Sequence, residues 1–254
     1  MVTGKEEREK LRRRRKIRFW SFLILFVMLA GGIIFCIRAP YFAVKEYRVN
    51  GNSYYTDEEI AIMGNCIKGP NIFVGVDYKE IRKRLLKDTY IRDVSFKRAL
   101  PDAVEITVKE RNQVACFRYS SSYLVIDDEG MYLRKTGVVP KLTILDGFTL
   151  SKITLGENIE VEESVQLNQA LGVLKTMEEN DMFFYMIRYS EAEMKAYVLE
   201  NLVVVGSPSD IIKKLKDKSI QATVSKLLNQ GIEYGSIIIT DTNVSDEIIF
   251  TPVI

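Results

Sequence analysis

Residues Tyr90 to Arg111 read YIRDVSFKRALPDAVEITVKER, and this stretch decides the fold of the region around it. Apolar and polar residues alternate on both sides of Leu100–Asp102, which is the pattern of two half-buried strands joined by a turn. The apolar residues of one face are Val94, Phe96, Val104, Ile106 and Val108. We expect a β-hairpin in which Phe96, Ile106 and Val108 are buried under covering helices.

The residues before this hairpin predict a strand and two helices. Val44–Val49 reads as a strand that ends at the turn residues Asn50–Asn52. Thr56 is followed three residues later by Glu59, a capping box that predicts the start of a short helix. A second helix is predicted next, with one apolar face made by Tyr78, Ile81 and Leu85. The order strand-helix-helix-strand-strand predicts a separate domain over residues 41–110.

Residues 111–254 predict a second domain, which is rich in strands. Short apolar runs predict strands at 114–118, 123–126, 131–135, 142–145, 186–189, 195–199, 202–205, 236–240 and 247–253. Helices are predicted at 161–180 and from the cap Ser207 to about Gln230. The predicted fold class is therefore α+β, with a βααββ domain followed by a mostly antiparallel β domain that carries two helices.

An apolar run precedes both domains. Residues 19–37 contain no charged side chain, and residues 1–18 contain nine Lys or Arg against three Glu. Such a run is long enough to cross a bilayer, and Lys and Arg are retained on the cytoplasmic face. We expect a cytoplasmic tail over residues 1–18, a transmembrane helix over 19–38 and an extracytoplasmic remainder. Cleavage after a signal peptide near Ala30–Gly32 is the alternative.

Composition excludes several classes of function. The formal net charge is +2, and residues 1–18 supply 9 − 3 = +6 of it, so the remainder carries about −4 and predicts no nucleic-acid binding. The chain has no histidine, which excludes Ser-His-Asp and Cys-His catalysis. Cys66 and Cys116 are expected to be free thiols, although a disulfide between them stays open. We expect no cofactor and no metal site.

Two short motifs could be taken for catalytic sites. Lys135–Gly137 reads K-T-G, but no serine is followed three residues later by lysine, so we expect a strand ending in a turn. Asp127, Asp128 and Glu129 precede Gly130 between two apolar runs, which predicts a hairpin turn rather than a carboxylate site. No catalytic residue is predicted.

Several of these stretches together resemble one protein family. They are Val49–Asn52, Tyr90–Val94 and Arg98–Arg111. They resemble a POTRA domain, and with the preceding apolar run the chain is similar to the FtsQ/DivIB family of bacterial cell-division proteins. That family usually has a proline two residues after its Glu-Arg pair, where this chain has Gln113. Tyr123–Asp127 resembles the family's second domain, so the resemblance extends over the chain.

The resemblance implies a non-enzymatic scaffold of the divisome. Family members hold FtsB/DivIC and FtsL partners to the septal FtsW and transpeptidase complex that makes peptidoglycan. These proteins are therefore the expected partners, and the division septum is the expected location.

The last two strands are the predicted partner-binding region. A terminal strand often leaves a sheet edge, and Ile248 and Ile249 lie in the final one. The resemblance points to Asp241, Val244 and Phe250 as counterparts of the family's FtsB/DivIC contact. The alternative is that Ile248 and Phe250 only complete the core.

Two other functions stay open from the sequence. One is a membrane-anchored POTRA protein that binds peptides as a chaperone. The other is an anchored cell-wall enzyme that uses the carboxylates of residues 127–129.

Overall fold

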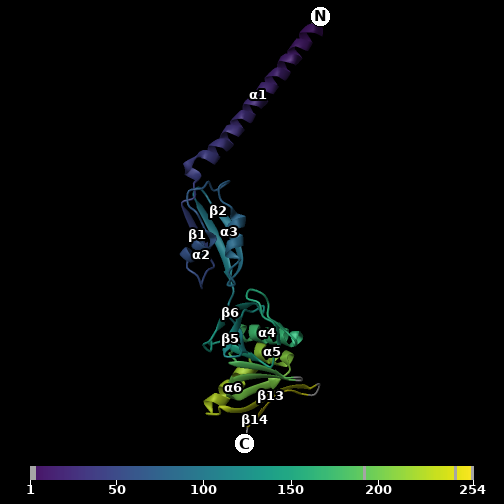
Figure 1. Cartoon of the computed structure of the whole chain (residues 1–254). Coiled ribbons are helices and arrows are strands. Elements are labelled where there is room, and N and C mark those ends of the chain that lie inside the picture. The colour runs from purple at the N-terminus through teal and green to yellow at the C-terminus, as the bar shows by residue number, and fades with distance from the viewer. Residues whose placement is uncertain (1–3, 191–192, 243–244, 253–254) are drawn as a thin grey trace. The chain divides into compact units, whose positions relative to one another are not determined.

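The computed structural model describes residues 4–190, 193–242 and 245–252, and it divides into two units. The first unit comprises Met1–Lys87 and Asp93–Glu110, and the second comprises Asp88–Arg92 and Arg111–Ile254. Figure 1 labels elements of both units where there is room.

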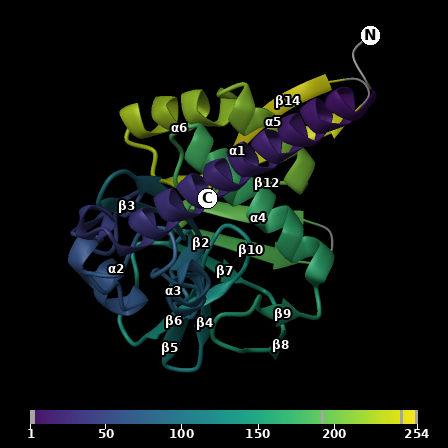
Figure 2. The ribbon, with the colours of Figure 1, turned by 90° about the horizontal axis from the view of Figure 1, so that it is seen from above.

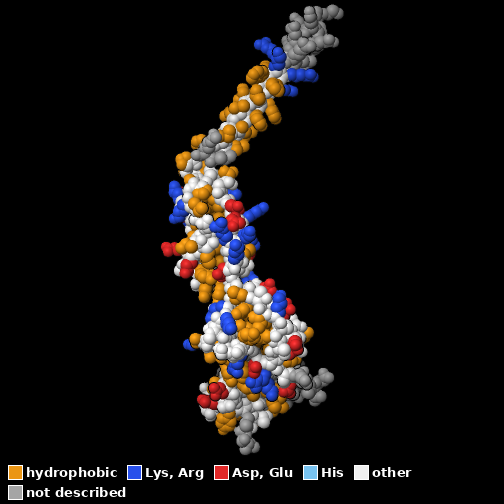
Figure 3. All heavy atoms as spheres, viewed as in Figure 1, with side chains coloured by type: hydrophobic (Ala, Val, Ile, Leu, Met, Phe, Trp, Pro, Cys, Tyr) orange, Lys and Arg blue, Asp and Glu red, His pale blue; other side chains and the backbone are white. Residues whose placement is uncertain are grey.

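Helix α1 (Gly4–Arg38) opens the first unit. Among the residues that the structure describes, it is the one helix long and apolar enough to cross a membrane, over Arg13–Phe35 with a mean hydropathy of 2.1. Its large apolar side chains are exposed at consecutive positions and therefore on all sides of the helix, and Figure 3 shows those on the near face. Lipid is the solvent that suits such a surface. The helix begins at Gly4 rather than Phe19 because Glu, Lys and Arg are good helix formers.

The rest of the first unit is a small sheet with two helices. In chain order its elements are η1 (Pro40–Phe42), β1 (Glu46–Asn50), α2 (Asp57–Gly64), α3 (Tyr78–Leu85), β2 (Ile91–Ala99) and β3 (Ala103–Glu110). The strand order is β1-β3-β2, and β1 runs parallel to β3. The predicted order strand-helix-helix-strand-strand is confirmed.

Local interactions explain where these elements begin and end. The capping box of α2 forms as predicted, because the Thr56 hydroxyl accepts from the Glu59 amide and the Glu59 carboxylate accepts from the Thr56 amide. Gly51 ends β1 at φ +83°, and a Cβ there would lie 2.3 Å from the Val108 carbonyl oxygen. Only glycine fits this turn without strain.

The predicted core of the hairpin is largely correct. Ile106 is fully buried and Val108 is 2% exposed, together with Val94 and Val104. Phe96 is only partly buried, because its ring packs against Tyr78 with centroids 5.3 Å apart at the rim of an open groove beside α3. The prediction of a fully buried Phe96 was wrong.

The second unit is built on a sheet of nine strands. They are β4 (Ala115–Tyr119), β5 (Ser122–Ile126), β6 (Tyr132–Thr136), β7 (Thr143–Asp146), β10 (Met186–Ser190), β11 (Glu193–Leu199), β12 (Asn201–Gly206), β13 (Tyr234–Thr242) and β14 (Ser245–Thr251). Their order is β14-β13-β12-β11-β10-β7-β4-β5-β6. Most neighbouring pairs are antiparallel, as predicted, but β7 is parallel to both of its neighbours and β12 is parallel to β13. A separate pair consists of β8 (Leu150–Lys152) and β9 (Glu160–Val161).

Helices cover one face of this sheet. They are α4 (Ser164–Glu179), α5 (Pro208–Lys216) and α6 (Ser219–Asn229). Helix α5 contacts β12 and β13, and α4 contacts α5. The three helices and β12 are labelled in Figure 2. The main core lies between the helices and the sheet, and its largest fully buried side chains include Phe117, Phe184, Ile187 and Met194. Burying one side chain of that size contributes about 1.5–3 kcal/mol.

The single helix predicted from Ser207 to about Gln230 is in fact two helices. Lys218 adopts a left-handed conformation at φ +63° between α5 and α6, which a continuous helix cannot contain. Asp217 stabilises the break, because its carboxylate accepts from the Ser219 amide at 2.8 Å. The chain can thus bury Ile211 on α5 and Ile220 on α6 in the same core.

Candidate functional site

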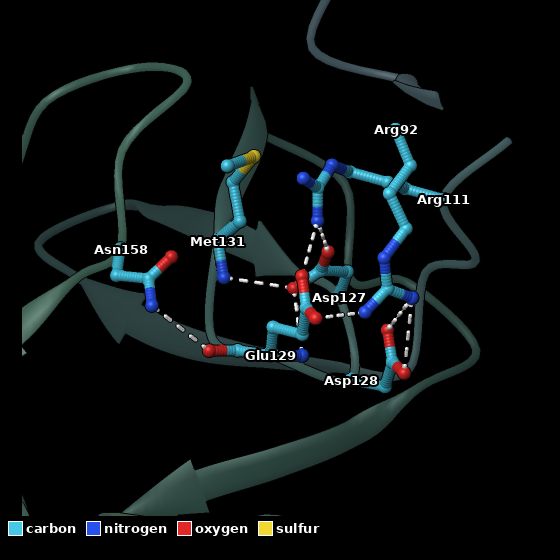
Figure 4. Close-up of polar contacts among 7 residues, drawn as sticks. All are labelled: Arg92, Arg111, Asp127, Asp128, Glu129, Met131 and Asn158. Carbon is cyan, nitrogen blue, oxygen red and sulfur yellow. Dashed lines mark hydrogen bonds and ion pairs between the residues drawn. The ribbon is translucent and has the colours of Figure 1, made fainter. Parts of the chain in front are cut away.

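The acidic residues Asp127, Asp128 and Glu129 form the turn between β5 and β6, as predicted from the sequence. Asp127 is fully buried, and its Oδ1 accepts from the backbone amides of Glu129 at 2.9 Å and Met131 at 2.8 Å. Its Oδ2 lies 2.5 Å from Nη1 of Arg111. Figure 4 shows these contacts. The Asp127 carboxylate therefore holds the turn and neutralises a guanidinium group.

Two arginines engage the other carboxylates of the turn. Arg111 Nη1 lies 2.9 Å from Glu129 Oε2, and Arg92 pairs with Glu129 and, at 3.3 Å, with Asp128. Hydrogen bonds from Arg111 and Arg92 hold the pKa of Glu129 below its ordinary value. A carboxylate pair for acid–base catalysis needs one member with a raised pKa. The geometry favours a structural ion-pair network and gives no support to the carboxylate enzyme.

The K-T-G motif and the two cysteines outside α1 also have structural surroundings rather than those of a reactive site. Lys135–Gly137 lies at the end of β6, where the Thr136 hydroxyl accepts from the Val138 amide at 3.2 Å, as expected of a strand ending in a turn. Cys66 and Cys116 are free thiols, and burial raises the pKa of each to about 11. Within the described ranges, no cluster of acidic, cysteine or histidine side chains could hold a metal ion.

Strand β14 is the outermost strand of the nine-stranded sheet as far as the structure describes it. It pairs with β13 in antiparallel register, with Ile239 opposite Ile248 and Ile237 opposite Phe250. Ile248 and Phe250 are partly buried against the main core, whereas Ile249 is 47% exposed on the other face. The terminal strand predicted to form an edge therefore does so, and its side chains alternate between core and solvent.

The other two predicted site residues, Asp241 and Val244, lie near the end of β13 and between β13 and β14 in the sequence. The backbone of Asp241 lies in β13 opposite Asp246, but its side chain is outside the described part. Val244 lies outside the described residues altogether. The structure thus brings Ile248, Ile249 and Phe250 together on one strand and leaves the placement of the other two side chains as a prediction.

The backbone groups of β14 that face its unpaired edge follow from the close approach of Gly235 on β13 to this strand. A Cβ on Gly235 would lie 3.0 Å from the Thr251 carbonyl oxygen, so this carbonyl points toward β13. Carbonyl and amide directions alternate along an antiparallel strand. The backbone of Ile249 therefore faces β13, while the amides and carbonyls of Ile248 and Phe250 face away from it.

The chain matches known proteins over most of its length. Residues 42–111 match the family model of the FtsQ-type POTRA domain. The chain is 30% identical over 231 residues to the cell division protein DivIB of Clostridium acetobutylicum, which covers 88% of this chain and 91% of that protein. The chain belongs to the DivIB/FtsQ family of cell division proteins.

Two further members of the DivIB/FtsQ family share fewer identical residues with this chain. DivIB of Clostridium botulinum strain Hall is 26% identical over 216 residues, covering 83% of this chain and 84% of the relative. Among solved structures, the major extracytoplasmic domain of the trans isomer of DivIB from Geobacillus stearothermophilus is 15% identical. It covers 42% of this chain and 87% of the solved one at a TM-score of 0.31.

In this DivIB/FtsQ chain, the adjacent residues Glu110 and Arg111 have a structural role in each unit. Glu110 accepts from the backbone amides of Ser53 and Tyr54 at 2.7 Å and from that of Tyr55 at 3.2 Å. Burial alone would raise the pKa of Glu110, but these bonds outweigh it and the pKa is lowered. Glu110 thus fixes the turn after β1, and its neighbour Arg111 fixes the acidic turn.

Sequence reasoning missed two residues at the candidate sites of this DivIB/FtsQ chain. Gly235 has φ +133°, and a Cβ there would come within 2.5 Å of the Phe250 ring, so glycine lets Phe250 settle on β13. A glycine inside a strand signals such a close approach, and Gly235 lies at the start of β13. Arg92 carries no comparable signal, because its acidic partners lie in another part of the sequence.

Proposed function

We propose that this chain is a non-enzymatic, membrane-anchored scaffold of the divisome. It links FtsB/DivIC-like and FtsL-like division proteins to the septal FtsW and transpeptidase complex during peptidoglycan synthesis. Helix α1 anchors it with the N-terminus in the cytoplasm, and the part of the chain after α1 lies outside the membrane at the division septum. Membership of the DivIB/FtsQ family supports the divisome role.

The basic tail supports this topology. Nine Lys or Arg and three Glu lie in residues 1–18, before the apolar part of α1. Lys and Arg near the end of a span keep that end in the cytoplasm. The part of the chain after α1 then shares a compartment with any septal partner that is also outside the membrane.

The open edge of β14 is the observation that carries the proposed binding mode. The backbone groups of Ile248 and Phe250 face away from β13, so an extended partner segment can add as a further strand. The side chains of these residues pack on the core while their backbone serves the partner. Core and interface roles are therefore compatible in the same residues.

The side chains on the solvent face of β14 and β13 would contact the side chains of the partner segment. Ile249 is 47% exposed, and its cross-strand partner Ile238 is partly exposed. An aliphatic partner side chain could cover both and gain roughly 1.5–3 kcal/mol if fully buried. With Asp241 and Val244, these residues make up the proposed contact.

Strand addition to the POTRA domain, the alternative chaperone mode, has weaker support. Strand β2 is the outer strand of the first sheet next to β3, but the Val94 carbonyl of β2 already accepts from Nη1 of Arg82. Arg82 also pairs with Asp93 at 2.6 Å. These contacts occupy part of the edge that a peptide would need.

A pull-down with the FtsB/DivIC homologue tests the proposed site. Ile249→Lys places a charge on the exposed face of β14 and removes the aliphatic surface that the partner would cover. Losing that contact should weaken binding by about tenfold or more, because a tenfold change in the dissociation constant corresponds to about 1.4 kcal/mol. Val165→Lys is the matched control, because Val165 is an exposed aliphatic residue on α4 in the same unit. It should bind normally.

Ile248→Pro complements this pair of variants, since it removes an amide that faces the open edge. Circular dichroism must show that each variant is folded. Full binding by folded Ile249→Lys and Ile248→Pro proteins would contradict the proposed site.

A further inference from the structure

Three segments of the first unit are tied together beside the end of α1. The Ile72 amide donates to the Phe42 carbonyl at 2.9 Å, and the Val44 amide donates to the Pro70 carbonyl at 2.9 Å. The Lys45 amide donates to the Asp102 carbonyl at 2.8 Å. Residues 40–45, the loop at 69–75 and the β2–β3 turn therefore form one surface.

This surface exposes large apolar side chains. Tyr41 is 64% exposed, Val74 63%, Leu100 59% and Phe73 39%. We call these four residues the juxtamembrane patch. They come from three separate segments, so their exposure does not result from the conformation of a single loop. Clustered apolar side chains on a protein surface mark a place where something other than water is bound.

The chain itself keeps the patch close to the membrane. Helix α1 ends at Arg38, and three further residues reach Tyr41, a span of at most about 10 Å. The Phe42 ring lies 5.4 Å from the Phe73 ring, so the loop at 69–75 is held to the same segment. The patch therefore lies within a few residues' reach of the point where α1 would leave the bilayer.

Basic side chains lie in the same segments as the patch or next to them in the sequence. Arg98 donates from Nε to the Ile72 carbonyl at 3.0 Å, and its guanidinium lies 5.8 Å from the centre of the Phe73 ring. The Lys97 side chain is 81% exposed and lies 3.7 Å from Glu105, and that of Lys45 is 69% exposed and lies 2.6 Å from Asp102. Aromatic rings beside lysine and arginine are the composition that membrane interfaces favour, because the rings enter the headgroup layer while the cations meet lipid phosphates.

We propose that the juxtamembrane patch rests on the outer surface of the membrane that α1 spans, with Phe73 and Val74 in the headgroup layer. The occupant of the patch is the lipid bilayer itself. This inference rests on the proposed span, and it adds a second membrane contact that restricts how the first unit can tilt. The lipid contact also accounts for the exposure of these four apolar side chains.

Tryptophan quenching by brominated lipid tests the inference on the full chain. The chain has one tryptophan, Trp20, so the wild type reports the span alone. A second protein, Trp20→Phe with Phe73→Trp, reports the patch. Both are reconstituted in vesicles of phosphatidylcholine and phosphatidylglycerol, with and without bromine on the acyl chains near the headgroup.

The control is Trp20→Phe with Tyr54→Trp. The Tyr54 amide bonds to Glu110, at the far end of β3 from the Asp102 turn. That strand has 8 residues, so at about 3.3 Å each the control lies about 26 Å away. Trp20→Phe with Val74→Trp is a second reporter should the Phe73 variant fail to fold.

We expect at least a twofold loss of emission for Trp20 and for the patch tryptophan, and none for the control. Quenching of Trp20 without quenching of either patch reporter would overturn the inference, leave the span intact and assign the patch to a protein partner. An unquenched Trp20 would overturn the span and the inference with it.

Discussion

Substitution of Asp127 tests whether the acidic turn stabilises the folded second unit. In Asp127→Asn, the remaining oxygen can still accept from the amides of Glu129 and Met131. The new amide group would face Arg111 Nη1, which now lies 2.5 Å from a carboxylate oxygen. The variant therefore loses one charge-assisted hydrogen bond and keeps the two bonds that shape the turn.

The magnitude follows from burial. The Asp127 side chain is fully buried and that of Arg111 is 11% exposed, so solvent screens the pair weakly. A hydrogen bond to a charged group is worth about 1.5–3 kcal/mol, and we expect Asp127→Asn to lower the free energy of unfolding by that amount. Asp127→Ala also strands two backbone amides and should cost about 3–5 kcal/mol.

Urea unfolding of residues 40–254, followed by circular dichroism, measures these values. The effect should appear in the transition of the second unit. A double-mutant cycle with Arg111→Met isolates the ion pair and should give a coupling of about 1–3 kcal/mol. Equal stability of wild type and Asp127→Ala, or a coupling near zero, would refute the reasoning.

Three further predictions concern topology, acid stability and the edge strand. In a variant without native cysteines, Ser151→Cys should react with a membrane-impermeant maleimide on intact cells and Arg8→Cys should not; labelling of both would contradict the proposed span. Folding lowers the pKa of Glu110 below its ordinary 4.5, so its carboxylate stabilises the first unit above that pH and the contribution is lost as pH falls through the folded pKa. Glu110→Gln should therefore flatten the decline in melting temperature below about pH 4.5, and an unchanged profile would count against the bond. Gly235→Ala should push Phe250 off β13 and weaken FtsB/DivIC binding, which a pull-down of the folded variant checks.

Much of the fold follows from local sequence signals. The Thr56–Glu59 capping box and the alternation around Leu100–Asp102 place helix and hairpin correctly because both depend on neighbours in sequence. The strands of the second unit were likewise predicted within a few residues. The short β8 and β9 were missed, since strands of 3 and 2 residues leave no periodic pattern.

Long-range features could not be predicted in the same way. The parallel pairing of β4, β7 and β10 depends on where the chain returns, and no local pattern encodes it. Phe96 has the alternation of a core residue, yet the groove beside α3 leaves it half open. At the candidate sites, the sequence predicts the edge position of β14. It does not predict the ion pairs of Arg92 and Arg111, because their acidic partners are distant in the sequence.

The single helix α1 also sets how strong the contact at β14 has to be. A partner anchored in the same bilayer diffuses only within the plane of the membrane, so its binding segment stays close to β14. Tethering of that kind gives an effective concentration of the partner on the order of 1 mM. At that concentration a contact with a dissociation constant of about 100 µM would be occupied about 90% of the time. A short edge strand can then hold its partner at the septum and still release it within the lifetime of one division.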